Sequence, residues 1–219
     1  MDLTEKINQL KKGETIQFDE SYLEDNQKEL IMLVKFLLTD EIYINYLKQI
    51  WSLIREDDLN LIKFDLYVSV LKQPQFNKKI AKFICLKERN LKYLTSNLIG
   101  KCETIDAMQY LIDSYKLNSG NIITGISDCY SYQQKAVIDK LLDMLTEQQK
   151  NMALDRFMRI NLDENNYVKK DLELVAYVLN KKNDWSEDIL NAESIKKLIF
   201  FNKINKNLQE ERKGKTLKI

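Results

Sequence analysis

A short amphipathic run recurs six times along the chain, at intervals close to those of helical-pair repeats. The runs start 34, 27, 31, 34 and 24 residues apart. Each run has apolar residues three and four apart, the spacing that gives a helix one apolar face. They span residues 42–51, 76–85, 103–112, 134–143, 168–177 and 192–201. Repeats of this length bury their apolar faces by stacking, so we expect a stack of helices, an architecture that usually works by binding.

Glycine and proline are scarce, with five Gly and one Pro in 219 residues. Folds built from tight turns need more of both, whereas the abundant Leu, Ile, Lys and Glu favour helices. We predict an all-α protein of about 10–13 helices, stacked as antiparallel pairs in a short α-solenoid. In this interpretation residues 1–20 are a polar lead-in, 21–208 are a single helical-repeat domain, and 209–219 are a basic, flexible tail.

Local signals place several of these helices. An apolar stripe runs through residues 26–38, and Thr39-Asp40-Glu41 then provides a cap for the next helix. Pro74 marks a break before a helix that begins near Phe76. Periodicity also predicts helices over 103–115, with Ile105 in the core, and over 185–207.

Three of the runs resemble the outer helix of ankyrin repeats. They read IDAMQYLIDSY at 105–115, AVIDKLLDML at 136–145 and ESIKKLIFF at 193–201, and the repeat length is similar to the ankyrin unit. The resemblance covers about the last half of the chain, which lacks the T-P-L-H start of the family's first helix. It implies protein binding through one concave face. An irregular helical bundle with a single core is the alternative architecture.

The charge is arranged in bands although the formal net charge is only +1. Net charges are −6 for residues 1–60, +7 for 61–101, −4 for 102–168 and +4 for 169–219, which sum to +1. The sharpest basic cluster is a candidate dock for an acidic protein surface, a phosphoinositide or nucleic acid, or else a solvated lysine face. Few aromatic residues interleave it, which disfavours a platform for single-stranded nucleic acid. The candidate residues are Lys78, Lys79, Lys82, Lys87, Arg89 and Lys92, joined by Tyr130 and Tyr132, which flank a turn and could anchor a partner.

Catalytic and metal-binding signatures are missing from the sequence. The chain has no His, which excludes Ser-His-Asp, Cys-His and H-E-x-x-H sites. Residues 120–127 have the G-x-x-x-x-G spacing of a phosphate loop, but Ile126 stands where the lysine belongs, so we read them as a helix start. Residues 163–174 lack the central Gly and final Glu of a calcium loop. We predict no catalytic residue, cofactor or metal.

These features favour a non-catalytic protein–protein interaction module. The three Cys lack a C-x-x-C pair and fit a reducing cytoplasm. The first twenty residues carry acids and no apolar core, so we expect no secretory signal peptide, and the longest uncharged stretch is too short for a membrane span. Acidic residues before Leu217-Lys218-Ile219 are similar to secretion signals of bacterial effectors, so translocation into a host cell is a second localisation to consider. The alternative functions are an enzyme with carboxylate or lysine chemistry in a helical pocket and a TetR-like regulator. The regulator is disfavoured because residues 1–30 carry four Lys against eight acids.

Overall fold

A computed structural model describes residues 3–55, 61–87, 95–161, 171–192 and 195–200. The described chain is all-α, with no β-strand in these ranges, which confirms the predicted fold class. Its contacts separate it into two compact units, 1–94 and 95–219, called unit 1 and unit 2 below. The prediction of one repeat domain over 21–208 stays a prediction. Among these residues no helix is both long and apolar enough to cross a membrane.

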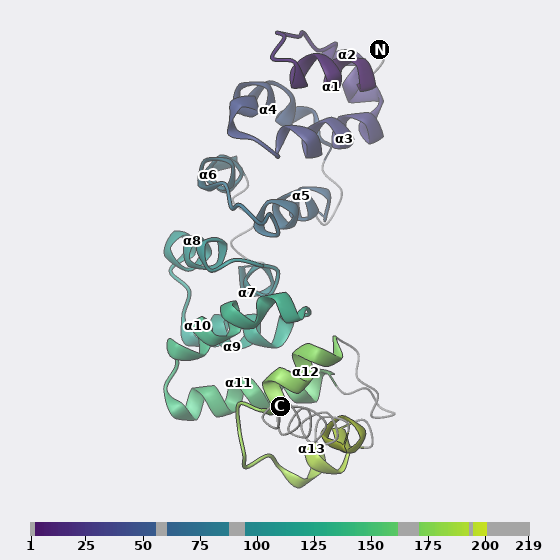
Figure 1. Ribbon diagram of the computed structural model, residues 1–219. Helices are drawn as coiled ribbons and strands as arrows, with labels where there is room; N and C mark the ends of the chain where they lie inside the picture. The colour runs from purple at the N-terminus through teal and green to yellow at the C-terminus, as the bar shows by residue number, and fades with distance from the viewer. Residues whose placement is uncertain (1–2, 56–60, 88–94, 162–170, 193–194, 201–219) are drawn as a thin grey trace, which may run out of the picture. The chain divides into compact units, whose positions relative to one another are not determined.

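Unit 1 begins with helices that pack around α3 (Figure 1). Leu30, Leu33, Val34 and Leu37 lie fully buried on the apolar stripe of α3, which agrees with the helix predicted over 26–38. Asp40 accepts a hydrogen bond from the backbone N–H of Ile42 and caps the next turn, as the sequence indicated. The elements of unit 1 are α1 (Leu3–Lys11), α2 (Glu20–Asp25), α3 (Gln27–Leu37), the 3-10 turn η1 (Glu41–Tyr43), α4 (Ile44–Ile50), the 3-10 turn η2 (Trp51–Leu53), α5 (Leu61–Leu71) and α6 (Lys78–Lys87).

The polar lead-in predicted over 1–20 contributes to the core of unit 1. Leu10 of α1 is buried, and its carbonyl accepts a hydrogen bond from the Tyr43 hydroxyl at 3.4 Å. Phe18 packs edge-on against Tyr46 with ring centroids 5.6 Å apart. The Ile16 N–H also donates to the Tyr46 hydroxyl. Ile16 and Phe18 thus hold the segment that precedes α2 against Tyr46 of α4.

In unit 2 most contacts between helices join helices that are two apart in chain order. α7 packs against α9, α9 against α11, and α8 against α10, while α7 also touches α8, α9 touches α10 and α11 touches α12. The elements are α7 (Thr95–Ile99), α8 (Ile105–Tyr115), α9 (Ser119–Asp128), the 3-10 turn η4 (Tyr132–Gln134), α10 (Lys135–Asp143), α11 (Glu147–Asn161), α12 (Leu172–Leu179) and α13 (Glu187–Asn191), followed by helical residues 195–200.

Two local expectations for unit 2 are wrong. Ile105 is 42 % exposed because it lies in the first turn of α8, ahead of the turns that face the core at Ala107 and Met108. The long helix expected over 185–207 is interrupted, because α13 ends at Asn191 and Ala192 leaves the helical conformation with ψ 127°. Residues 201–207 lie outside the described residues.

Candidate protein-binding site

The first two turns of α6 present three of the predicted lysines. α5 ends at Leu71, ahead of Pro74, and α6 begins at Lys78. The Asn77 side chain caps the new helix, its Oδ1 accepting hydrogen bonds from the backbone N–H groups of Lys79 (3.0 Å) and Ile80 (3.2 Å). Ile80 and Ile84 are fully buried on the opposite face, where α6 packs against α5. Burial of that face directs Lys78, Lys79 and Lys82 outward, and all three are exposed.

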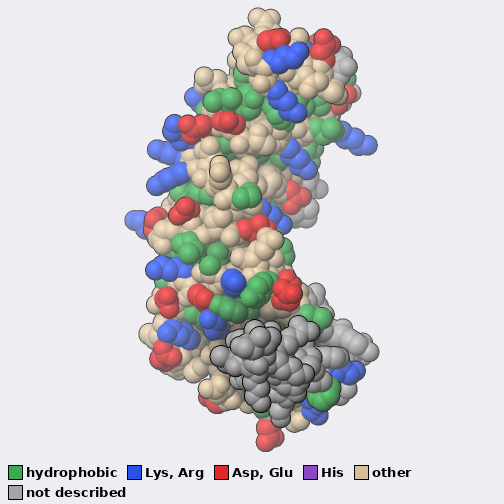
Figure 2. Space-filling view, in the orientation of Figure 1, with side chains coloured by type: hydrophobic (Ala, Val, Ile, Leu, Met, Phe, Trp, Pro, Cys, Tyr) green, Lys and Arg blue, Asp and Glu red, His purple; other side chains and the backbone are tan. Residues whose placement is uncertain are grey.

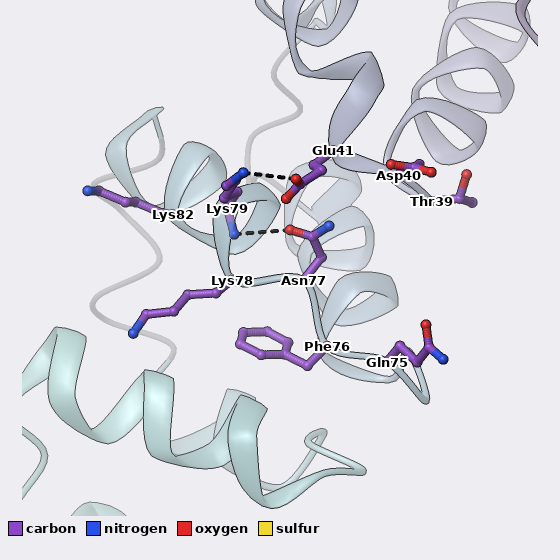
Figure 3. Close-up of a pocket in the computed structure, with 9 residues that line it drawn as sticks. All are labelled: Thr39, Asp40, Glu41, Gln75, Phe76, Asn77, Lys78, Lys79 and Lys82. Carbon is purple, nitrogen blue, oxygen red and sulfur yellow. Dashed lines mark hydrogen bonds and ion pairs between the residues drawn. The ribbon is translucent and has the colours of Figure 1, made fainter. Parts of the chain in front are cut away.

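These lysines line an open pocket of about 690 Å³ within unit 1, called the lysine pocket here (Figure 3). One wall comes from the residues between α3 and α4, and the other from the entry and first turns of α6. In Figure 2 basic side chains gather at the left edge at the height of α6, with acidic side chains close above them. The lining residues are Thr39, Asp40, Glu41, Gln75, Phe76, Asn77, Lys78, Lys79 and Lys82.

Charge in the lysine pocket is only partly neutralised. Lys79 Nζ forms an ion pair with Glu41 Oε1 at 2.8 Å, a contact between exposed groups that stabilises the fold by about 0–1 kcal/mol. Within the described ranges Lys78 and Lys82 make no hydrogen bond or ion pair. They are four residues apart on one helix face, and in Figure 3 both side chains extend outward from α6, away from Asp40 and Glu41. Two cations without a partner in the described residues and one half-buried aromatic ring therefore line the same pocket.

The remaining basic candidates are only partly covered by the structure. Lys87 is the last residue of α6, and its backbone alone is described. Arg89 and Lys92 lie outside the described residues.

Tyr130 and Tyr132 belong to unit 2, so the eight predicted residues divide between the two units. The Tyr130 hydroxyl donates to Glu103 Oε1 at 3.1 Å. Tyr132 packs edge-on against Tyr177, with centroids 5.9 Å apart and planes at 84°. Both rings are half-buried and each lies under a lysine ammonium, Lys101 at 5.0 Å and Lys135 at 4.7 Å. These contacts account for both tyrosines within the fold, and their role as partner anchors stays a prediction.

The most enzyme-like cluster in the described residues joins Asp139, Tyr177 and Lys181. The Tyr177 hydroxyl donates to Asp139 Oδ2, and Lys181 Nζ lies 2.6 Å from Asp139 Oδ1. Burial and then the hydrogen bond to Asp139 raise the pKa of Tyr177. Burial lowers the pKa of Lys181, but hydrogen bonds to Asp139 and Tyr177 outweigh it and leave that pKa raised. The cluster joins Asp139 of α10 to Tyr177 of α12 and to Lys181, which follows α12, and the raised pKa values do not favour Tyr177 or Lys181 as a general base near neutral pH.

Other candidate sites are accounted for by helix structure. Residues 120–127 form most of α9, whose N-cap is Asn118, so they make a helix start and no phosphate loop. No group of three or more acidic or Cys side chains in the described chain is arranged to hold a metal ion. The calcium-loop comparison at 163–174 lies mostly outside the described residues.

No family model, curated protein or solved structure matches the chain. The ankyrin resemblance therefore stays a prediction, and function has to be argued from the pocket itself.

Sequence reasoning missed the acidic wall and the aromatic ring of the lysine pocket. Glu41 was interpreted only as part of a helix cap, and its pairing with Lys79 joins positions 38 residues apart. The sequence predicts a helix that begins near Phe76, yet Phe76 lies ahead of α6 and lines the pocket. The Asn77 cap was the one local signal that could have moved the helix start beyond Phe76.

Proposed function

We propose that the protein is a non-catalytic interaction module that holds an acidic segment of a partner protein in the lysine pocket. The observation that carries this proposal is the pair Lys78 and Lys82, exposed and without a partner in the described residues, on the rim of a pocket that also contains Phe76. Two cations at this spacing attract carboxylates and speed encounter with an acidic surface. The aromatic ring adds apolar contact, which charge alone does not supply.

The packing in unit 2 supports an interaction module of stacked helices. Helix-pair repeats produce rows of helices. In unit 2 one row consists of α7, α9 and α11, and a second row consists of α8 and α10. A divergent ankyrin-like array is the specific form we propose. Enzymatic function is less favoured, because Asp139, Tyr177 and Lys181 are joined to one another by a hydrogen bond and an ion pair, and the pKa values of Tyr177 and Lys181 are raised. A TetR-like regulator is less favoured by the acidic N-terminal sequence.

The test is charge reversal in the lysine pocket. Immobilised wild type, Lys78→Glu/Lys82→Glu and a control, Lys28→Glu/Lys35→Glu, are each incubated with bacterial and with eukaryotic lysates. The control changes the same charge at exposed positions of α3 in the same unit, outside the pocket. We expect a protein retained by wild type and control to be lost from the pocket variant. When this captured protein is purified, calorimetry should show that it binds the pocket variant at least about tenfold more weakly than it binds wild type.

Two results would contradict the proposal. Equal recovery of every protein by all three forms would show that the lysine pocket does not take part in binding, and capture of nothing by wild type would count against the interaction module itself.

From the composition and the tail sequence we propose a cytoplasmic protein that is delivered to a host as a bacterial effector. A reporter fused to the chain, followed into host cells with and without residues 209–219, tests that setting separately.

A further inference from the structure

The lysine pocket carries both signs of charge on opposite walls. Asp40 is exposed, and its carboxylate accepts the Ile42 N–H at 3.1 Å, which fixes it at the start of η1. Glu41 follows it and keeps 41 % of its side chain exposed while paired with Lys79. In Figure 3 Asp40 and Glu41 lie on one wall of the pocket, and Lys78 and Lys82 extend from α6 away from them. The acidic and the basic side chains therefore lie at separate places on the pocket, and a bound segment has to span the pocket to reach both.

We propose that the lysine pocket selects a dipolar peptide segment, one that carries carboxylates on one side and a cationic side chain on the other. The carboxylates pair with Lys78 and Lys82, and the cation lies against Asp40 and Glu41. An apolar side chain between them packs on Phe76. This inference rests on the proposed function, and it adds the chemistry of the partner.

The negative wall sets this specificity by repulsion as well as attraction. A segment with carboxylates alone places like charge beside Asp40 and Glu41, and like charges brought together at an interface weaken binding. A nucleic acid presents phosphates along its whole backbone and cannot avoid that wall. A dipolar segment satisfies both walls, so charge complementarity favours a peptide over either polyanion.

Helical geometry gives the carboxylates a spacing. Lys78 and Lys82 are one helical turn apart on α6, where neighbouring Cβ atoms are about 5–6 Å apart. A partner helix with Glu at i and i+4 presents its carboxylates at the same interval. Because Lys79 is paired with Glu41, these two lysines are the unpaired cations on the pocket wall in the described residues.

Binding of labelled synthetic probes, followed by fluorescence anisotropy, tests the inference. The probes are a helical peptide with Glu at i and i+4 and Lys on the adjoining face, a peptide of equal length and apolar content with only acidic charges, and a short DNA duplex. We expect wild type to bind the dipolar peptide about tenfold more tightly than either polyanion. In Asp40→Asn/Glu41→Gln that preference should disappear, because the dipolar peptide loses its cation contacts while Lys79 becomes available to carboxylates. Asn retains the capping oxygen at residue 40, and circular dichroism checks that the variant is folded.

The outcomes separate this inference from the proposed function. If Lys78→Glu/Lys82→Glu weakens both peptides but wild type binds them equally, the lysine pocket binds acidic segments and the dipolar inference is overturned. Tight DNA binding by wild type also overturns it. If the charge reversal changes nothing, or if no peptide binds wild type, the proposed function fails together with the inference. Lys28→Glu/Lys35→Glu should match wild type throughout.

Discussion

Buried polar side chains in unit 2 fix the turn between α9 and α10. Gln134 is fully buried, and both the nitrogen and the oxygen of its side-chain amide form hydrogen bonds. Its Nε2 donates to the carbonyls of Gly100 (2.9 Å) and Cys102 (2.8 Å), and its Oε1 accepts from the backbone N–H groups of Tyr130 (2.8 Å) and Ser131 (3.1 Å). Four backbone groups, two from residues 100–102 and two from residues 130–131, therefore depend on one side chain.

Replacement of Gln134 by Ala should destabilise unit 2 by about 2–4 kcal/mol, because buried backbone groups lose their partners and a cavity remains. Guanidinium unfolding followed by fluorescence measures the change. The control is Gln133→Ala, whose side chain is exposed and which should leave the free energy of unfolding within about 0.5 kcal/mol of wild type. Equal effects of the two substitutions would contradict this role of Gln134.

Asp171 makes part of the stability of unit 2 depend on pH. A hydrogen bond from the Tyr132 N–H lowers the pKa of this carboxyl, burial opposes that shift, and bonds from Glu173 and Leu174 N–H groups add to it. Because the pKa is lower in the folded state, the carboxylate stabilises the fold above the ordinary value of 3.8, and this contribution is lost as pH falls through the folded pKa. Wild type should be more stable than Asp171→Asn at about pH 6, and the difference should shrink below about pH 3.5. Urea unfolding of both forms across this range is the measurement, and a constant difference would contradict the assignment.

At the scale of elements, the end of α7 lies tightly against α9 at Gly100. A Cβ on Gly100 would lie 2.5 Å from Asp128 Cβ and 2.8 Å from the Asp128 carbonyl carbon. Gly100→Ala should therefore separate α7 from α9 and lower the free energy of unfolding by about 1–3 kcal/mol. Gly120→Ala is the matched control, because the added methyl group meets only Asn118 Oδ1, at 3.2 Å. Thermal unfolding of both variants tests the prediction, and a Gly100→Ala protein as stable as the control would refute the close contact.

Elements with a strong apolar stripe were predictable from the sequence, as α10 illustrates. Val137, Ile138 and Leu141 follow the apolar spacing of the run at 134–143 and are all fully buried, because 3.6-residue periodicity reports one buried face directly. Periodicity does not report which residues of an apolar stripe extend beyond the neighbouring helices, and this is why the sequence predicts Ile105 in the core although it lies exposed at the start of α8.

The lysines of the candidate site were visible in the sequence as a local excess of positive charge. Their separation into paired Lys79 and unpaired Lys78 and Lys82 depends on Glu41, a tertiary contact with no local signal.

At the scale of the whole molecule, each compact unit contains one of the two tryptophans. Trp51 is buried in unit 1 and packs edge-on against Phe83, with centroids 5.7 Å apart. Trp185 is buried in unit 2, and its Nε1 donates to the Leu179 carbonyl at 2.9 Å. Tryptophan fluorescence can therefore report each unit separately, with Trp185→Phe retaining the signal of unit 1 and Trp51→Phe that of unit 2.

Contacts concentrated within the units predict that they unfold in separable steps. Gly100→Ala supplies the perturbation, because Gly100 and Asp128 both belong to unit 2. Added to each single-tryptophan form, it should lower the guanidinium midpoint reported by Trp185 and leave the midpoint reported by Trp51 unchanged. Cooperative unfolding of the whole chain would instead shift both midpoints equally, since a two-state transition has one free energy for all probes. Separable transitions would also mean that charge reversal at Lys78 and Lys82 can be assessed in unit 1 without loss of unit 2, so a binding defect in those variants could be assigned to the lysine pocket.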